Sequence, residues 1–408
     1  MDVNLKYGKT SINFNCPEKS YRLETREPVM DIDKEDFYRR LTDILPVDKD
    51  KYTNVGIVIS DKTRLCGYPL YLPWITDILQ KKGAQKSDIT FYIAYGTHAR
   101  QTEEESLQSY GCVYNEYRFV HHDCYDEAAL VQLGNTGRGT SVKVRKDVLG
   151  SSLMITFGAI SHHYFAGYGG GRKLLFPGLA ARKSIYQNHG LFLDRQNRKL
   201  ARGCQPGQLE GNPLAEDLKE INGLMPPKIS IHGLLNSRGE VWKLRIGENY
   251  NDFLSACREH DSYFRSGDNK QFDLVIASSG GYPKDINFIQ AHKSVHHAAA
   301  FVKDGGKLVM VSECVDGIAS DYFLKYFEAG SFEQAFKELE KNYEGNGGTA
   351  LSMMAKTSRI DIYMMTSLSE ELCATLNVTK TDINGIQRII DAEKGSVAVI
   401  GNASLLVR

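Results

Sequence analysis

Ionisable and hydroxyl-bearing side chains follow three short apolar runs of the sequence. The runs span residues 55–60, 89–95 and 153–157, and the side chains after them are Asp61, Arg64, Thr97, His98, His162 and His163. Imidazole accepts or releases a proton near neutral pH. A guanidinium holds a carboxylate through two parallel hydrogen bonds. Together these residue types are a stronger signal of a functional site than any one of them is alone.

Each of these residues also has a purely structural interpretation. Asp61 can cap a turn after its strand, and Arg64 can be a solvated surface charge. The adjacent side chains of His162 and His163 should diverge, so at most one of them should face a site. The pair His121 and His122 is interpreted as structural.

A glycine-rich basic segment, Gly167 to Lys173, lies close after the third run. It matches neither the Walker A spacing nor the dinucleotide fingerprint. Its consecutive glycines, Gly169, Gly170 and Gly171, allow close backbone approach to a ligand and can present N–H groups to a phosphate. Lys173 precedes Leu174-Leu175-Phe176, which should partly desolvate its amine and favour a covalent anchor or nucleophile. The alternatives are a flexible turn or a lysine that binds phosphate as a plain cation.

The elements that must position these side chains resemble a parallel sheet. Strand-like 55–60, an apolar helical segment over 70–80 and strand-like 89–95 form a βαβ unit. Ligands bind outside the carboxyl ends of parallel strands, so the side chains after the runs should converge on one rim. Further strands are expected at 274–278, 308–312 and 396–407, a hairpin or loop within 131–148, and a helix over 383–393 that Asp382 caps.

The length of 408 residues predicts two domains. We expect an α/β fold in which each domain is built on a largely parallel sheet with flanking helices, with the active site in the interdomain cleft. The boundaries expected are 1–268 for a cofactor-binding and catalytic domain, with residues 393–408 possibly rejoining it, and 269–392 for a C-terminal domain.

Composition excludes several classes of protein. Lys plus Arg (50) equals Asp plus Glu (50), so bulk charge suggests neither nucleic acid nor an acidic membrane as a partner. No apolar run approaches the length of a membrane helix, and residues 1–14 lack the apolar core of a secretory signal. The 8 cysteines are scattered and form no CxxC pair, which is typical of reduced thiols. These features predict a cytoplasmic protein.

The motifs together resemble the lactate racemase family, in the same order over most of the chain. The resemblance rests on Asp61-Lys62-Thr63-Arg64, Gly96-Thr97-His98, the run from His163 through Lys173 to Pro177-Gly178, Asn188-His189, Gln290 and Lys293. It implies a nickel-pincer nucleotide, a pyridinium mononucleotide with thio-acid groups that hold nickel, and partner enzymes that synthesise this cofactor.

The resemblance also implies a role for each matched residue. Lys173 would be the covalent tether and His189 the protein ligand to nickel. His98 and His163 would be the acid/base pair, while Arg64 and Lys293 would hold the substrate carboxylate. The remaining matches would support the cofactor or substrate: Asp61, Thr97, Gly169, Gly170, Gly171 and Gln290.

The activity implied is the racemisation or epimerisation of a small 2-hydroxy acid through a 2-keto acid intermediate. A single base contributes about 10²–10⁴-fold and enzymes commonly need about 10⁶-fold or more, so a cofactor should carry the hydride. Two departures from the family pattern, Ala99 after His98 and Ile289 before Gln290, predict a substrate other than, or broader than, lactate. Two alternatives stay open: a zinc hydrolase built on His98, His163 and His189, and a non-catalytic nickel- or ligand-binding homologue.

Overall fold

The computed structural model describes the backbone of residues 1–408 and the side chains of all of them except residue 321. The chain divides into two compact units. The seven-stranded unit comprises Glu27–Leu191 and Gly203–Ser262. The six-stranded unit comprises Met1–Arg26, Phe192–Arg202 and Tyr263–Arg408.

The seven-stranded unit is built on a sheet of order β14-β13-β9-β4-β5-β6, with β10 paired to β9. Its central strands are parallel, so their carboxyl ends share one edge, while β14 and β10 run antiparallel to their neighbours. The strands are β4 (Val55–Ser60), β5 (Ile89–Ala94), β6 (Arg118–His121), β9 (Leu153–His163), β10 (Gly167–Gly169), β13 (Ile229–Leu235) and β14 (Val241–Gly247). A separate hairpin joins β7 (Leu130–Asn135) and β8 (Ser141–Arg145).

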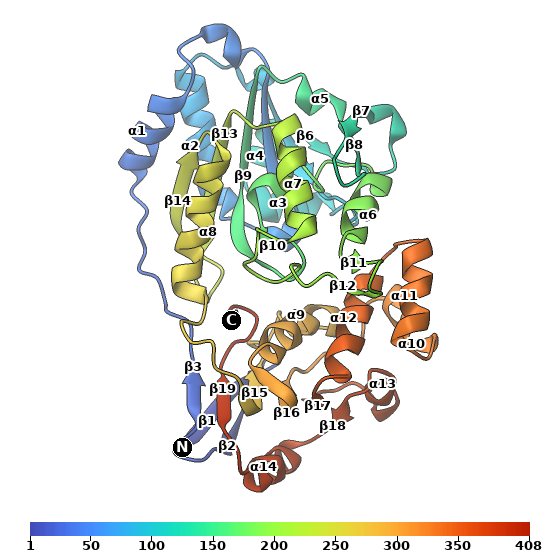
Figure 1. Ribbon diagram of the computed structural model, residues 1–408. Helices are drawn as coiled ribbons and strands as arrows, with labels where there is room; N and C mark the ends of the chain where they lie inside the picture. The colour runs from blue at the N-terminus through green and yellow to red at the C-terminus, as the bar shows by residue number, and fades with distance from the viewer. The chain divides into compact units, whose positions relative to one another are not determined.

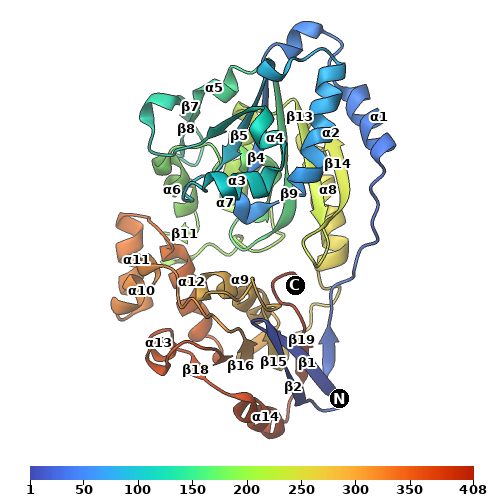
Figure 2. The same cartoon turned by 180° about the vertical axis from the view of Figure 1, so that it is seen from behind.

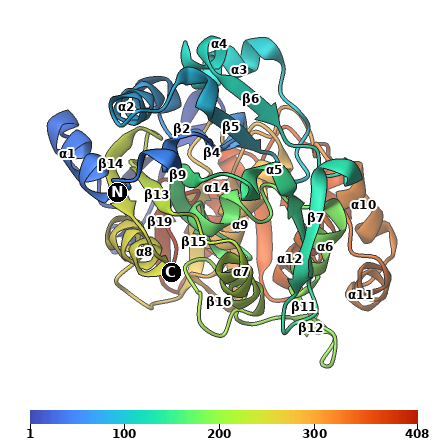
Figure 3. The ribbon, with the colours of Figure 1, turned by 90° about the horizontal axis from the view of Figure 1, so that it is seen from above.

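Helices cover both faces of this sheet (Figures 1 and 2). Alternate residues of its strands, such as Ile57 and Ile59, point to one face and pack against α2 and α1 in one buried core. The view from above shows α2, α3 and α4 on one side of β4 and β9, and α7 and α8 on the other (Figure 3). The helices are α1 (Lys34–Ile44), α2 (Tyr68–Lys81), α3 (Glu103–Tyr110), α4 (Val113–Glu116), α5 (Lys146–Leu149), α6 (Arg182–Gly190), α7 (Pro213–Leu224) and α8 (Tyr250–Phe264).

The six-stranded unit contains a fully parallel sheet of order β18-β17-β16-β15-β19-β3. The strands are β3 (Tyr21–Leu23), β15 (Phe272–Ser278), β16 (Val302–Val311), β17 (Asp361–Met365), β18 (Thr379–Lys380) and β19 (Val397–Ile400). Five helices pack into the core on one face: α9 (Phe288–Ala299), α10 (Asp321–Glu328), α11 (Phe332–Lys341), α12 (Gly347–Thr357) and α13 (Glu370–Thr375).

The other face of the same sheet is covered by a hairpin and a helix. These are β1 (Asp2–Tyr7), β2 (Thr10–Asn15) and α14 (Ile383–Ala392). The short pair β11 (Leu193–Asp194) and β12 (Lys199–Leu200) completes the unit. Among the helices that the structure describes, none combines the length and the apolar character that crossing a bilayer would require.

The α/β class with parallel sheets and two domains is confirmed, and the expected strands, the first βαβ unit and the hairpin within 131–148 are present. Asp382 caps α14 by accepting a hydrogen bond from the N–H of Gly385 at 2.7 Å. The division of the chain differs from the expected boundaries. Residues 393–408 lie in the unit that contains 269–392, because β19 pairs with β15. Residues 1–26 join the same unit, because β3 pairs with β19.

Lys356 of α12 is a buried amine in the six-stranded unit. Its Nζ donates to the carbonyl oxygen of Ser352 at 2.8 Å and to the Ser352 hydroxyl at 2.6 Å. Ser352 Oγ also lies 3.4 Å from Nδ1 of His296 on α9. Burial, with a smaller contribution from the charge of Arg359, lowers the pKa of Lys356 to about 7. The folded protein therefore holds this proton more weakly than the unfolded chain does.

We expect the free energy of unfolding to rise as the pH rises from about 7 towards 10.5, the ordinary pKa of lysine. Over this range the unfolded chain binds a proton that the folded protein lacks, and the gain is at most several kcal/mol. Lys356→Met should remove this rise and stabilise the protein most at neutral pH. Denaturant titrations at several pH values measure the free energy of unfolding, and the exposed Lys337→Met is the control. If the rise in this free energy with pH is unchanged in Lys356→Met, groups other than Lys356 cause it.

Candidate functional site

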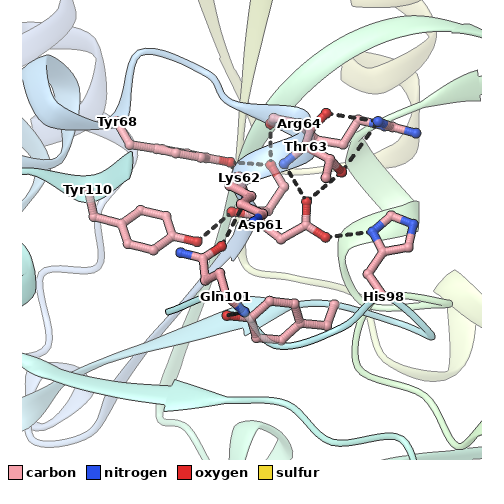
Figure 4. Close-up of polar contacts among 10 residues, drawn as sticks. Asp61, Lys62, Thr63, Arg64, Tyr68, His98, Gln101 and Tyr110 are labelled. Atoms are coloured by element: carbon pink, nitrogen blue, oxygen red, sulfur yellow. Dashed lines mark hydrogen bonds and ion pairs between the residues drawn. The ribbon is translucent and has the colours of Figure 1, made fainter. Parts of the chain in front are cut away.

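The first element of the site is a carboxylate–imidazole pair at the carboxyl edge of the larger sheet. Asp61 directly follows β4 and His98 follows β5, and these strands are adjacent and parallel. Nδ1 of His98 lies 2.6 Å from Oδ2 of Asp61 (Figure 4). The Asp61 side chain is 4% exposed, whereas that of His98 is 50% exposed. A buried carboxylate thus holds an imidazole that reaches solvent.

Asp61 stays ionised in this position. Burial raises its pKa, but the hydrogen bond and charge of His98 and the hydrogen bonds from Thr63 outweigh burial and leave the pKa below its ordinary value. The N–H and hydroxyl of Thr63 donate to Oδ1 at 2.8 and 2.6 Å. Because an ionised carboxylate only accepts, His98 donates from Nδ1, and Nε2 of the neutral ring carries the lone pair.

Buried polar groups beneath this pair fix the chain between β4 and α2. The Tyr68 hydroxyl lies 2.5 Å from Ser60 Oγ and donates to the carbonyl oxygen of Phe157 at 3.0 Å. Tyr110 donates to the carbonyl oxygen of Ser60 at 3.0 Å. The side-chain oxygen of Gln101 accepts from the N–H of Lys62 at 3.0 Å (Figure 4). The turn that carries Asp61 is therefore held by neighbours on three elements.

Arg64 ends the same turn, and its side chain is exposed. Its Nη1 donates to the carbonyl oxygen of Thr63 at 2.8 Å, and Figure 4 shows the side chain lying over this turn. Among the side chains that the structure describes, no carboxylate forms an ion pair with Arg64. Its guanidinium therefore remains available to a carboxylate from solution.

His162 and His163 lie at the end of β9, next to the hairpin that β9 forms with β10, and their side chains have different partners. His162 pairs with Tyr168 across the hairpin, and both side chains bond to Asp261 of α8, at 2.8 and 2.6 Å. Nδ1 of His163 accepts from the N–H groups of Phe165 and Ala166, both at 3.2 Å. Because Nδ1 accepts, the neutral ring carries its proton on Nε2. The two histidines therefore have different partners: His162 bonds to a carboxylate, and His163 bonds to backbone N–H groups.

His189 lies on α6 and is half-buried. Burial lowers its pKa to about 3, and the positive charges of Lys173 and His98 add to this shift. These three residues therefore lie close enough to interact electrostatically. His189 stays neutral at physiological pH, the form in which an imidazole binds a metal ion.

The glycine-rich segment turns back towards the strand ends. Gly170 and Gly171 have φ values of +71° and +50°, and a Cβ at Gly170 would lie 2.1 Å from the carbonyl oxygen of Ala159. This close approach requires glycine at position 170. The N–H of Gly96 donates to the carbonyl oxygen of Gly178 at 2.9 Å. This bond holds the loop that contains the exposed Thr97 against the residues that follow Lys173. Lys173 itself lies in the 3₁₀ turn Gly171–Leu174.

Sequence reasoning missed a buried carboxylate that supports α6. Asp217 of α7 is fully buried and accepts hydrogen bonds from Thr136, Thr140 and Asn188, at 2.5, 2.7 and 2.8 Å. Asn188 directly precedes His189, so this carboxylate orients the end of α6. An aspartate inside an amphipathic helix gives no local signal of such a role; only the fold brings its three donors together.

Gln290 and Lys293 lie in the six-stranded unit, on the first turns of α9. Nζ of Lys293 donates to Oε1 of Gln290 at 2.6 Å. Asn287 caps the helix by accepting from the N–H of Gln290 at 3.0 Å. Ile289 is partly buried and packs against the core of this unit. Core packing accounts for at least part of its apolar character, which weakens the inference of an altered substrate.

The structure does not support the zinc hydrolase alternative. Among the residues that it describes, no group of three or more His, Cys, Asp or Glu side chains is placed to hold a metal ion. A catalytic zinc site needs three protein ligands.

Comparison with known proteins identifies relatives of this chain. The profile of the lactate racemase N-terminal domain matches residues 7–201, and that of the lactate racemase C-terminal domain matches residues 267–350. Lactate racemase from Thermoanaerobacterium thermosaccharolyticum is 27% identical over 340 residues, which cover 80% of this chain and 78% of the relative. Lactate racemase from Lactiplantibacillus plantarum is 30% identical over 278 residues, which cover 66% of this chain and 62% of the relative.

Two solved structures share the fold. The lactate racemase apoprotein from Thermoanaerobacterium thermosaccharolyticum superposes with a TM-score of 0.87 at 24% identity, over 100% of both chains. A crystal structure of a Thermotoga maritima protein gives a TM-score of 0.67 at 17% identity, over 94% of this chain and 99% of that one. The chain belongs to the lactate racemase family, whose named members are isomerases.

Proposed function

We propose that this protein racemises a small 2-hydroxy acid, lactate or a close homologue, with the help of a nickel-pincer nucleotide. The observation that carries the proposal is the Asp61–His98 pair at the carboxyl edge of the sheet, and Lys173 and His98 both act electrostatically on His189. The pair supplies a base, and its neighbours supply an amine and a neutral imidazole. Membership of the lactate racemase family supports the substrate class.

The residues present fit the proposed cofactor. His189 is a neutral imidazole, the form that binds a metal ion, and would be the protein ligand to nickel. Lys173 would tether the nucleotide, and Asp61, Thr97 and Gly169–Gly171 would line its binding site. When bound, a group of this class reversibly accepts and returns the Cα hydride, chemistry that no side chain here provides.

The two histidines start in complementary states. His98 presents the lone pair of Nε2 and takes the hydroxyl proton of one enantiomer, while the charge of Asp61 stabilises the imidazolium that forms. In its protonated form His163 donates a proton to the developing alkoxide of the other enantiomer, and it becomes the neutral ring whose Nδ1 accepts from Phe165 and Ala166. Arg64 holds the substrate carboxylate. The roles of the two histidines exchange when the reaction runs in reverse.

The test is a screen of single enantiomers of 2-hydroxy acids, from lactate to longer homologues, with protein produced alongside the cofactor-synthesis enzymes. Chiral chromatography should show both enantiomers accumulating to equal amounts. The apoprotein should be inactive. Full activity of the apoprotein, or no racemisation of any 2-hydroxy acid by loaded protein, would reject the proposal.

Asp61→Asn should lower kcat by about 10²-fold while leaving the protein folded. The neutral amide no longer stabilises the imidazolium and can donate to Nδ1, which places the ring proton on the wrong nitrogen. Steady-state kinetics measures the loss, and ¹⁵N NMR of the histidine rings reports the tautomer. The exposed Asp123→Asn is the matched control. An Asp61→Asn enzyme with normal kcat would remove Asp61 from the mechanism.

A further inference from the structure

Arg172 is a buried cation that the proposed chemistry does not use. It lies in the turn Gly171–Leu174 and is 4% exposed. Its Nη2 donates to the carbonyl oxygen of Ala166 at 2.9 Å, and the guanidinium stacks on Phe253 of α8 at 4.7 Å from the ring centroid. Its Nε and Nη1 have no hydrogen-bond partner among the described residues. Two donors of a buried charged group are therefore unsatisfied.

A cavity of about 40 Å³ adjoins this guanidinium within the seven-stranded unit. A water molecule needs about 10–15 Å³ by the same measure, so the cavity holds about three water-sized groups. Its lining residues are Gly171, Arg172, Asn222, Pro226, Pro227, Ser230, His232, Glu248, Asn249, Tyr250 and Phe253. Pro226, Glu248 and Asn249 are exposed, so a ligand can enter from solvent.

His232 is the second unsatisfied group on this cavity. It points from β13 to the same sheet face as Ser230, opposite to Ile231. It is 1% exposed, and neither of its ring nitrogens has a partner among the described residues. Burial lowers its pKa to about 4, so the ring is neutral and offers one donor and one acceptor.

The protein supplies no counter-charge for Arg172. Among the described side chains no carboxylate pairs with it, and the carboxylate that lines the cavity, Glu248, accepts from Lys228 at 3.0 Å. Asp252 nearby accepts from the N–H groups of Glu248 and Asn249. Burying a cation without a partner is unfavourable, and a bound anion would offset this cost.

We propose that this cavity is a binding site for a phosphate-class oxyanion held by Arg172 and His232. Phosphate offers several acceptor oxygens to the guanidinium, and near neutral pH its monoprotonated form also offers a donor to the acceptor nitrogen of His232. A carboxylate offers acceptors only and would leave that nitrogen unsatisfied. The phosphate can be free or can belong to a phosphate monoester. The site does not depend on racemase activity.

The experiment follows thermal unfolding of the purified apoprotein in chloride buffer of constant ionic strength. Added inorganic phosphate should raise Tm by roughly 5 °C near saturation, and acetate should have little effect. Arg172→Met keeps the packing on Phe253 and should abolish the response. The exposed Arg118→Met should respond like the wild type. His232→Gln is the second variant and should weaken the response if Arg172→Met does not fold.

A further arm uses nicotinic acid mononucleotide, a pyridinium nucleotide with a phosphate monoester. A stronger Arg172-dependent shift with this compound identifies a nucleotide phosphate as the natural occupant, and an equal or weaker shift identifies free phosphate. Both results support the site. Equal shifts with phosphate, acetate and extra chloride, or a phosphate shift unchanged in Arg172→Met and His232→Gln, would overturn it and leave a cavity filled by water.

Discussion

Lys173→Ala is expected to leave a folded protein that carries no covalent nucleotide and has no measurable racemase activity. Lys173 lies in a turn that glycines close, and its charge acts on His189. Its partly desolvated amine is suited to covalent attachment, and an amide-type bond would remove a positive charge beside two histidines. Loss of the tether removes the group that carries the hydride, so the expected effect exceeds that of losing any single acid or base.

Intact-mass and peptide analysis of protein produced with the cofactor-synthesis enzymes measures this outcome. The wild type should carry an adduct on Lys173 that survives denaturation, and Lys173→Ala should carry none. Lys183→Ala, an exposed lysine on α6, should keep the adduct and the activity. Active wild-type enzyme with an unmodified Lys173 would show that this residue binds its ligand as a plain cation.

His98→Ala and His163→Ala should each reduce kcat by about 10²–10⁴-fold, the usual contribution of one positioned acid or base. Each variant should keep the nucleotide adduct, because neither histidine is the proposed tether or nickel ligand. The loss should be visible from both enantiomers, because each direction needs one base and one acid. Initial rates from each enantiomer, with adduct stoichiometry by mass, separate a catalytic loss from a binding loss.

The exposed Arg100→Ala, two residues after His98, is the control for this region and should keep most of the activity. Near-normal turnover of His98→Ala or His163→Ala would remove that histidine from its proposed role. Loss of the adduct together with activity would instead assign the residue to cofactor binding.

Local patterns predicted the elements of the fold well, and their long-range assembly poorly. Residues 55–59 are apolar because β4 is buried along its whole length, and this pattern is visible in the sequence. The pairing of β3 with β19 joins residues about 375 positions apart. No local propensity encodes such a partner, because the ladder depends on backbone groups that every strand shares. The expected domain limits failed at the two ends of the chain for this reason.

For the candidate site, too, the sequence predicted some features and not others. The rule that ligands bind at strand ends placed Asp61 and His98 on one edge, and the structure pairs them at 2.6 Å. The state of each histidine was not predictable, because it depends on the partner of Nδ1: a carboxylate for His98 and backbone N–H groups for His163. Asp217 was missed because its donors come from two other segments.

Racemisation of one lactate enantiomer labelled with deuterium at Cα, in ordinary water with cofactor-loaded protein, tests the central claim most directly. Mass spectrometry of the separated product enantiomers follows the label. If the Cα hydrogen leaves and returns as a hydride, the opposite enantiomer should form with most of its deuterium retained. Formation of the opposite enantiomer with hydrogen from solvent at Cα would show proton abstraction, and absence of any opposite enantiomer would contradict racemase activity on lactate.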